Sequence, residues 1–271
     1  MSGARPDGRP PRPRVGVLPA AMAVAAGTAW LDRRGALPGG GRRWVRRNHR
    51  GLEVTLVEGV ALALGASVPL VVVEPASAAA VLLAAGAGAV DDLGGDSGVK
   101  GLRGHLGALR RGTVTTGVLK IGVLGAAGLL AAWAGDRERG RGQHTLAAAG
   151  LVAGSANLAN LLDLRPGRAL KAGLLVGLPL AGAQPSAAAC CGAALAALPD
   201  DLRSRSMLGD TGANALGAAL GVAAARQLST RGRWCWLAVV SGLTLLSERV
   251  SFSRVIDATP GLRQLDRWGR G

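Results

Sequence analysis

Long apolar blocks alternate with short polar segments along almost the whole chain. The blocks consist mainly of Ala, Leu, Val and Gly, and the segments between them carry clusters of Arg and Lys. This pattern is typical of a protein that crosses a membrane several times. About nine blocks can be drawn, at residues 15–31, 54–73, 76–90, 113–134, 145–162, 169–182, 186–198, 213–228 and 234–247.

The blocks predict an all-α fold, a polytopic membrane helix bundle of about nine spans. Several blocks are shorter than the ~20 residues of a straight span, so we expect tilted, broken or buried helices among them. Gly and Ala recur at close spacing, as in GANALGAALG, and small residues let helices pack closely in a membrane. We predict a disordered basic arm at 1–14, a transmembrane domain at 15–248 and a cytoplasmic tail at 249–271.

Basic residues in the loops predict the orientation of the bundle. With nine spans, the loops after the odd-numbered blocks and the tail hold more Arg and Lys than the other loops, which places them in the cytoplasm. The N-terminus is then outside, although its own arginines argue weakly against this. A net charge of +15 could also indicate nucleic acid. The chain has no Tyr and one Phe, and basic loops facing an anionic leaflet explain the charge, so we expect no nucleic-acid partner.

Four aspartates stand at the ends of these blocks. Asp91 and Asp92 end the third block, Asp163 ends the fifth and Asp210 precedes the eighth, so the predicted topology puts all four on the cytoplasmic face. Charged residues also mark the ends of ordinary spans, where their cost is small. Carboxylates grouped beside basic loops nevertheless suit Mg²⁺, which binds a few carboxylates together with substrate phosphates and waters.

Three motifs around these aspartates resemble a known family. AVDDLGGDSGVKGLRGHLGAL has an aspartate pair and a following Lys-Gly-Leu loop, NLANLLDLRPG has an Asn-x-x-Asn-Leu-x-Asp pattern, and MLGDTGANALGAALG has a Met-x-Gly-Asp block. A weaker fourth block is RNHRGLEVTLVEG. In this order they resemble the polyprenyl-phosphate N-acetylhexosamine-1-phosphate transferases, over most of residues 15–250.

The resemblance implies a transferase reaction at a cytoplasmic membrane face. The phosphate of a polyprenyl phosphate attacks the β-phosphate of a UDP-sugar, which gives a polyprenyl-diphosphate sugar and UMP with the help of Mg²⁺. By position, Asp210 is the candidate Mg²⁺ ligand, and Asp91 would position or deprotonate the lipid phosphate. Asp92 would support the metal or the diphosphate.

The resemblance also implies residues on the donor side. Asp163 is a further candidate catalytic residue, and Asn157 and Asn160 precede it at steps of three on one helical face, where they would bind the nucleotide sugar. Lys100 is a candidate phosphate partner. The implied location is the bacterial cytoplasmic membrane, where the enzyme serves cell-envelope glycan synthesis. The resemblance leaves open whether the protein forms a homodimer.

The chain differs from the family in ways that keep other functions open. The family has a His-rich motif in its last large cytoplasmic loop, whereas His49, His105 and His144 are the only histidines here. The second acid of the Asn-x-x-Asn motif is also missing. A catalytically degenerate membrane scaffold or lipid-carrier-binding protein is therefore an alternative. A transporter is a third possible function, but its acidic residues would be expected in the middle of the spans and not at their ends.

Overall fold

The computed structural model describes residues 16–37, 41–47, 51, 53–94, 101–138 and 144–270, except for the side chains of residues 102, 103 and 106. Within these ranges the fold is all-α, as predicted, with one small hairpin. The long helices are α1 (Val17–Arg33), α2 (Val57–Ser67), α4 (Pro75–Gly94), α6 (Thr116–Arg137), α7 (Thr145–Leu162), α8 (Arg168–Ala181), α9 (Pro185–Leu202), α10 (Gly209–Gln227) and α11 (Thr230–Ser247).

Shorter elements connect and flank these helices. The block at 54–73 is divided into α2 and α3 (Leu70–Val73), and Pro69 lies between them, where its missing N–H ends the first helix. A 3₁₀ turn (Arg42–Trp44) leads into the antiparallel strands β1 (Val45–Arg47) and β2 (Glu53–Thr55). The remaining helices are α5 (Gly101–Arg110), α12 (Phe252–Ala258) and α13 (Pro260–Arg267).

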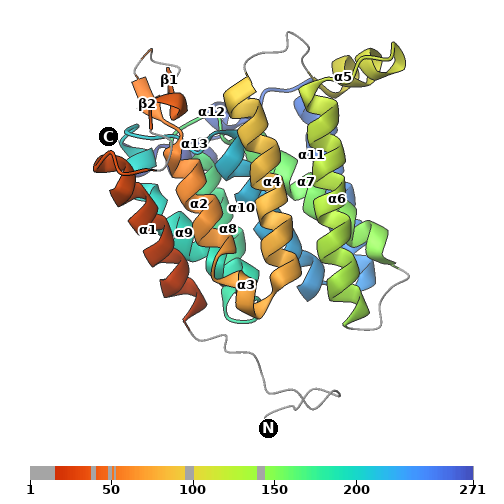
Figure 1. Ribbon diagram of the computed structural model, residues 1–271. Coiled ribbons are helices and arrows are strands. Elements are labelled where there is room, and N and C mark those ends of the chain that lie inside the picture. Colours follow the sequence, from red (N-terminus) through yellow and green to blue (C-terminus); the bar gives the residue numbers. More distant parts are fainter. Residues whose placement is uncertain are drawn as a thin grey trace.

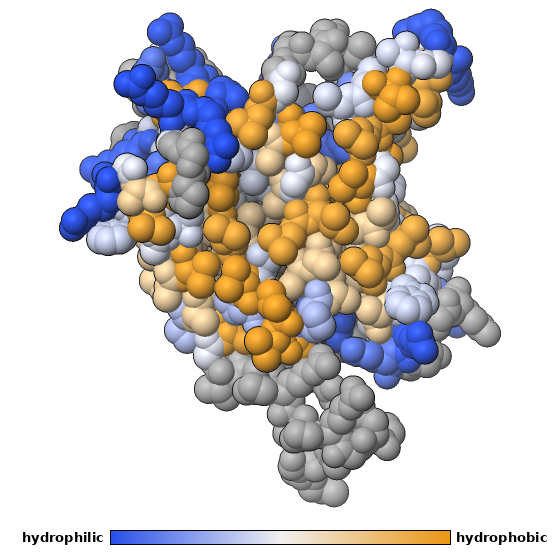
Figure 2. All heavy atoms as spheres, viewed as in Figure 1, coloured by the Kyte–Doolittle hydropathy of each residue, from blue (hydrophilic) through white to orange (hydrophobic). Residues whose placement is uncertain are grey.

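Within the part of the chain that the structure describes, three helices are long and apolar enough to cross a membrane, namely α4, α6 and α7. α11 and α12 would add a fourth if they count as one span, but a bend of 96° separates them. Apolar surface covers the middle of the face formed by α4 and α6, and hydrophilic residues gather toward the two ends (Figure 2). These features indicate a membrane protein. Nine spans and the orientation of the termini stay predictions.

α10 forms the centre of the bundle. It is buried along most of its length and packs mainly against α7, α4, α2 and α9 (Figure 1). Small residues allow these close approaches, since a Cβ at Gly217 would overlap the carbonyl oxygen of Ser155 on α7. The core around α10 is built mostly from Ala, Leu and Val.

The two ends of the bundle differ in what they carry. One end holds β1 and β2, α5, and the tail helices α12 and α13, and we call it the hairpin end (Figure 1). α4 ends there and α10 begins there, so the C-terminus of one helix meets the N-terminus of the other. The opposite end holds α3 and the start of α7. The four candidate aspartates from the sequence lie at the hairpin end.

Candidate functional site

Four helices bring polar residues together at the hairpin end of the bundle. Asp91 lies in the last turns of α4, Lys120 in the second turn of α6, Asn160 in the last turn of α7 and Asp210 in the first turn of α10. These four residues form what we call the acid cluster. Three of them were predicted from sequence motifs that lie up to 119 positions apart, whereas Lys120 was not predicted.

Lys120 is the centre of the acid cluster. Its Nζ lies 3.2 Å from Asp91 Oδ2 and also forms an ion pair with Asp210 Oδ2. The Asn160 amide completes the group when its nitrogen faces Asp210, because it then donates to Asp210 Oδ1 at 2.9 Å and accepts from Lys120 at 3.2 Å. The lysine side chain is 11% exposed, and Asp91 and Asp210 are 22% and 30% exposed, so the cluster is reachable from outside.

Asp92 has a different environment from its neighbour Asp91. Its Oδ1 accepts a hydrogen bond from the backbone N–H of Asp210 at 3.0 Å, and its Oδ2 accepts from Thr211 N at 2.9 Å and Thr211 Oγ1 at 2.6 Å. A carboxylate at a helix N-terminus satisfies free N–H groups there and is favoured by the helix dipole. Asp92 therefore fixes the start of α10, and with it the position of Asp210.

The contact between α4 and α10 at this point depends on two glycines. A Cβ at Gly88 would overlap the backbone carbonyl of Asp210, so α4 can approach the start of α10 only without a side chain there. Gly209 adopts a φ of +59°, which glycine accepts at little cost, and it lies against the Asp92 carboxylate. Asp92 can reach the start of α10 because of this close approach.

Asp163 follows the end of α7 and adds negative charge next to the cluster. Burial raises its pKa well above the usual range, and the carboxylates of Asp201, Asp210 and Asp92 raise it further. The backbone N–H of Gly209 has a smaller opposite effect. Several carboxylates therefore lie near Asp163, and such an acidic environment favours a bound cation.

The other two predicted site residues lie apart from this arrangement. Asn157 is one turn before Asn160 on α7, and its Nδ2 lies 3.4 Å from Thr244 Oγ1 on α11, so it joins two helices. Lys100 lies outside the described residues.

The acid cluster can supply part of a magnesium site. Asp91 and Asp210 both reach the Lys120 ammonium, so their oxygens approach one common point. Among the described residues, no three or more His, Cys, Asp and Glu side chains are grouped closely enough to hold a metal by themselves. Two carboxylates fit Mg²⁺, which commonly completes its shell with waters and substrate phosphates. Asp92 is better suited to positioning Asp210 than to binding the metal directly, since both its oxygens already accept hydrogen bonds from the start of α10.

An apolar groove runs from the middle of the membrane-facing surface to Lys120. α4 and α6 form it, with a volume of about 510 Å³, and its wall includes Leu82, Leu83, Gly86, Val90 and Leu119. Lys120 lies at the hairpin end of this wall and also in the acid cluster. Apolar side chains cover this part of the surface (Figure 2). A long hydrocarbon chain and a charged head group could therefore bind side by side here.

No protein-family model and no curated protein sequence matches this chain. The family resemblance accordingly stays a prediction that depends on the three motifs.

Proposed function

We propose that this protein is a membrane-embedded transferase that moves a sugar-1-phosphate from a UDP-sugar to polyprenyl phosphate. One observation carries the proposal. An apolar groove suited to a hydrocarbon chain and a cluster of acids suited to a Mg²⁺-bound diphosphate meet at one residue, Lys120. The three motifs that resemble the transferase family contribute Asp91, Asn160 and Asp210 to that meeting point.

In this proposal each residue has a role that follows from its position. The polyprenyl chain lies in the groove, and its phosphate approaches Lys120, whose ammonium attracts the phosphate as a point charge. Asp91 beside it orients the attacking phosphate. Asp210 would hold Mg²⁺, with Asn160 beside it on the side of the donor diphosphate, and the metal when bound would supply neutralisation of the charge on the phosphate oxygens. Asp92 positions Asp210 through the start of α10.

The test is turnover by the purified protein in detergent or nanodiscs. With polyprenyl phosphate, Mg²⁺ and a panel of UDP-sugars, the protein should release UMP, and Asp210→Asn and Asp91→Asn should each reduce that release by about 10²-fold or more, as the loss of a catalytic electrostatic group does. Asp200→Asn is the matched control, because Asp200 lies at the same end but pairs with Arg33 and Arg205. Normal turnover in Asp210→Asn would refute the metal role.

A second candidate function is a carrier-binding protein without turnover. Its support is the ammonium of Lys120, which in this structure already forms ion pairs with both acids that a metal would use. Such a protein would bind polyprenyl phosphate and release no UMP with any donor. Binding of the lipid, measured in the same preparations, separates this candidate from an inactive sample.

A further inference from the structure

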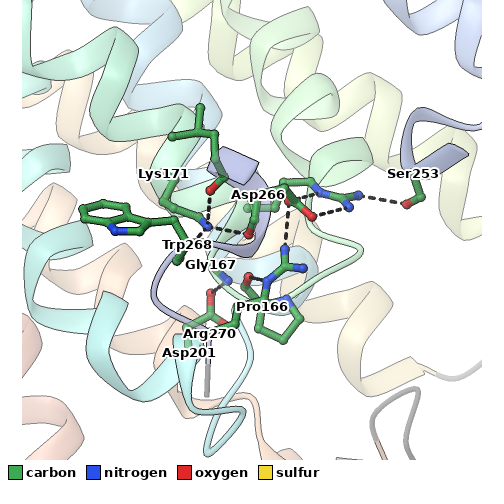
Figure 3. Close-up of polar contacts among 10 residues, drawn as sticks. Pro166, Gly167, Lys171, Asp201, Ser253, Asp266, Trp268 and Arg270 are labelled. Carbon is green, nitrogen blue, oxygen red and sulfur yellow. Dashed lines mark hydrogen bonds and ion pairs between the residues drawn. The ribbon is translucent and has the colours of Figure 1, made fainter. Parts of the chain in front are cut away.

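The C-terminal tail is attached to the bundle by a buried polar network rather than by helix packing. After the bend that follows α11, α12 and α13 pack mainly against each other, and within the described residues neither packs extensively against a helix of the bundle. Several apolar residues of the tail are exposed, including Leu262 at 47% and Trp268 at 72%. The attachment therefore depends on the few polar contacts that Figure 3 shows.

Two basic residues of α8 make most of these contacts. Arg168 donates from Nε and Nη2 to the two oxygens of Asp266, at 2.8 and 3.1 Å, and from Nη1 to Ser253 Oγ at 2.8 Å. Lys171, three residues later on the same face of the helix, donates to the backbone carbonyls of Leu265, Asp266 and Trp268, at 2.9, 2.6 and 3.1 Å. Both side chains are buried, and their recorded partners all lie in the tail.

The tail brings a second cation into the same network. Arg270 donates to Asp266 Oδ1 at 2.8 Å and to the carbonyl oxygen of Pro166 at 2.7 Å. Asp201 of α9 accepts from the backbone N–H of Gly167 at 2.8 Å, just before α8 begins (Figure 3). Because Asp266 and Arg270 leave together with the tail, Arg168 and Lys171 would then lose the Asp266 carboxylate, and these two cations would lie near the one carboxylate of Asp201, which acts on Lys171.

The geometry at Asp266 is the one that arginine uses for phosphate as well as for carboxylate. A guanidinium binds either group through two parallel N–H donors, and a nearby ammonium adds a point charge. Both cations lie in the first turn of α8, whose N-terminus also favours an anion. A phosphoryl group would satisfy the same donors as the Asp266 carboxylate.

We propose that Arg168 and Lys171 form a binding site for a phosphoryl group, and that Asp266 of the tail occupies this site in the present structure. The tail and a phosphorylated ligand then compete, so ligand binding releases the tail. Release also frees Pro166 in the loop that follows Asp163, which connects the site with the acid cluster. The inference does not require the transferase reaction.

The first experiment uses the wild-type protein and follows the tail. In phosphatidylcholine nanodiscs, trypsin should remove the tail at Arg263 and Arg267 several-fold faster in the presence of inorganic pyrophosphate than with NaCl of equal ionic strength. A second arm replaces pyrophosphate by phosphatidylglycerol in the nanodisc. Acceleration in the first arm assigns a free phosphate, acceleration in the second assigns a lipid head group, and acceleration in neither overturns the proposal.

The second experiment measures pyrophosphate binding by calorimetry. Asp266→Asn should bind at least about tenfold more tightly than the wild type, because the competing carboxylate is gone and the open state is no longer a minor one. Asp257→Asn, an exposed aspartate of the same tail, should bind like the wild type. Adding Arg168→Gln to Asp266→Asn should abolish the gain. Equal affinities of Asp266→Asn and the wild type would contradict the proposal.

The acid cluster could also bind pyrophosphate when Mg²⁺ is present, so a third variant separates the two sites. Asp210→Asn removes a residue of the cluster and leaves the tail contacts intact. The response of the tail to pyrophosphate should persist in this variant. A response that disappears with Asp210→Asn would place the phosphate in the cluster instead of at α8, whereas loss of UMP release alone would concern only the proposed transferase.

Discussion

The two ends of the bundle both bury charged side chains, but they balance them differently. At the opposite end, Arg233 is 2% exposed and its guanidinium binds both oxygens of Asp136, at 3.0 and 2.6 Å, and the carbonyl of Ala225 at 2.8 Å. Thr145 donates to the same carboxylate at 3.1 Å. One cation and one anion are thus paired and hydrogen-bonded, and they join α6, α7, α10 and α11.

At the acid cluster of the hairpin end the charges do not balance. Asp91 and Asp210 pair with one ammonium, that of Lys120, and Asp92 and Asp163 add two further carboxylates near Asp210. Burial and these acidic neighbours raise the pKa of Asp163. The matched ion pair at the opposite end serves to hold four helices together. A surplus of one sign in a partly exposed place is typical of a functional site, because a ligand of opposite charge can complete it.

The largest effect should come from breaking the matched pair. Asp136→Ala leaves the Arg233 guanidinium buried without its carboxylate, which typically costs 3–5 kcal/mol of unfolding free energy. Unfolding in detergent, followed by circular dichroism, measures the loss. The double variant Asp136→Leu with Arg233→Met should recover much of it, because both charges are then absent. If Asp136→Ala is as stable as the wild type, the ion pair of Asp136 and Arg233 does not stabilise the contact between these helices.

A somewhat smaller effect should appear at the hairpin end as a dependence on pH. Burial raises the pKa of Asp201 from 3.8 to about 6, against the opposing hydrogen bond from Gly167 N–H and the charges of Arg270 and Lys171. The folded protein therefore binds this proton more tightly than the unfolded chain does. The free energy of unfolding should fall as pH rises from about 4 to about 6 and change little from this group above that range.

Asp201→Asn removes this pH-dependent cost and can still accept the hydrogen bond from Gly167. At pH 7 it should be more stable than the wild type by up to about 3 kcal/mol, and the difference should vanish near pH 4. Unfolding curves across this pH range, with Asp257→Asn as the control, measure it. Parallel profiles for Asp201→Asn and the wild type would show that the carboxyl ionises as freely in the fold as in water.

The smallest expected effect tests the close approach of α4 to α10. Gly88→Ala places a methyl group against the backbone of Asp210 and should cost about 1–3 kcal/mol by overpacking, together with most of any transferase activity. Gly125→Ala on α6 is the control, because a Cβ there meets no atom within 4 Å and Ala favours the helix. Unchanged stability of Gly88→Ala would mean that α4 can move aside.

The helical part of the fold could be predicted because apolar blocks in the sequence have the length of helices. The block at 145–162 coincides with α7, and each of the other eight blocks overlaps one long helix, although most of these helices extend beyond the bounds of the block. The short elements were not predicted. α5, α12 and α13 lie in polar, Gly- and Arg-rich sequence outside the apolar blocks. The leucines of α5 and α13 nevertheless recur at helical spacing, at 102, 106 and 109 and at 262 and 265, so for these two helices a signal in the sequence was missed.

The candidate site was only partly predictable. The motifs indicated which acids to consider, but Asp91 and Asp92 are adjacent in sequence and their different partners arise from the packing of α10 beside α4. Lys120 had a signal that could have been used, since a lone lysine in an apolar block needs a partner. The ion pair of Arg168 could not be predicted, because nothing in the sequence identifies Asp266, nearly a hundred residues later, as its partner.

The groove is lined by α4 and α6 along the side of the bundle, whereas the acid cluster lies at the hairpin end. In the proposed reaction, a lipid would therefore arrive by lateral diffusion within the bilayer, and a nucleotide sugar would arrive from water. The two approach paths meet at Lys120 without crossing. Steric access then imposes no order on the arrival of the two substrates, and a lipid-anchored product can leave without its hydrocarbon chain ever entering water.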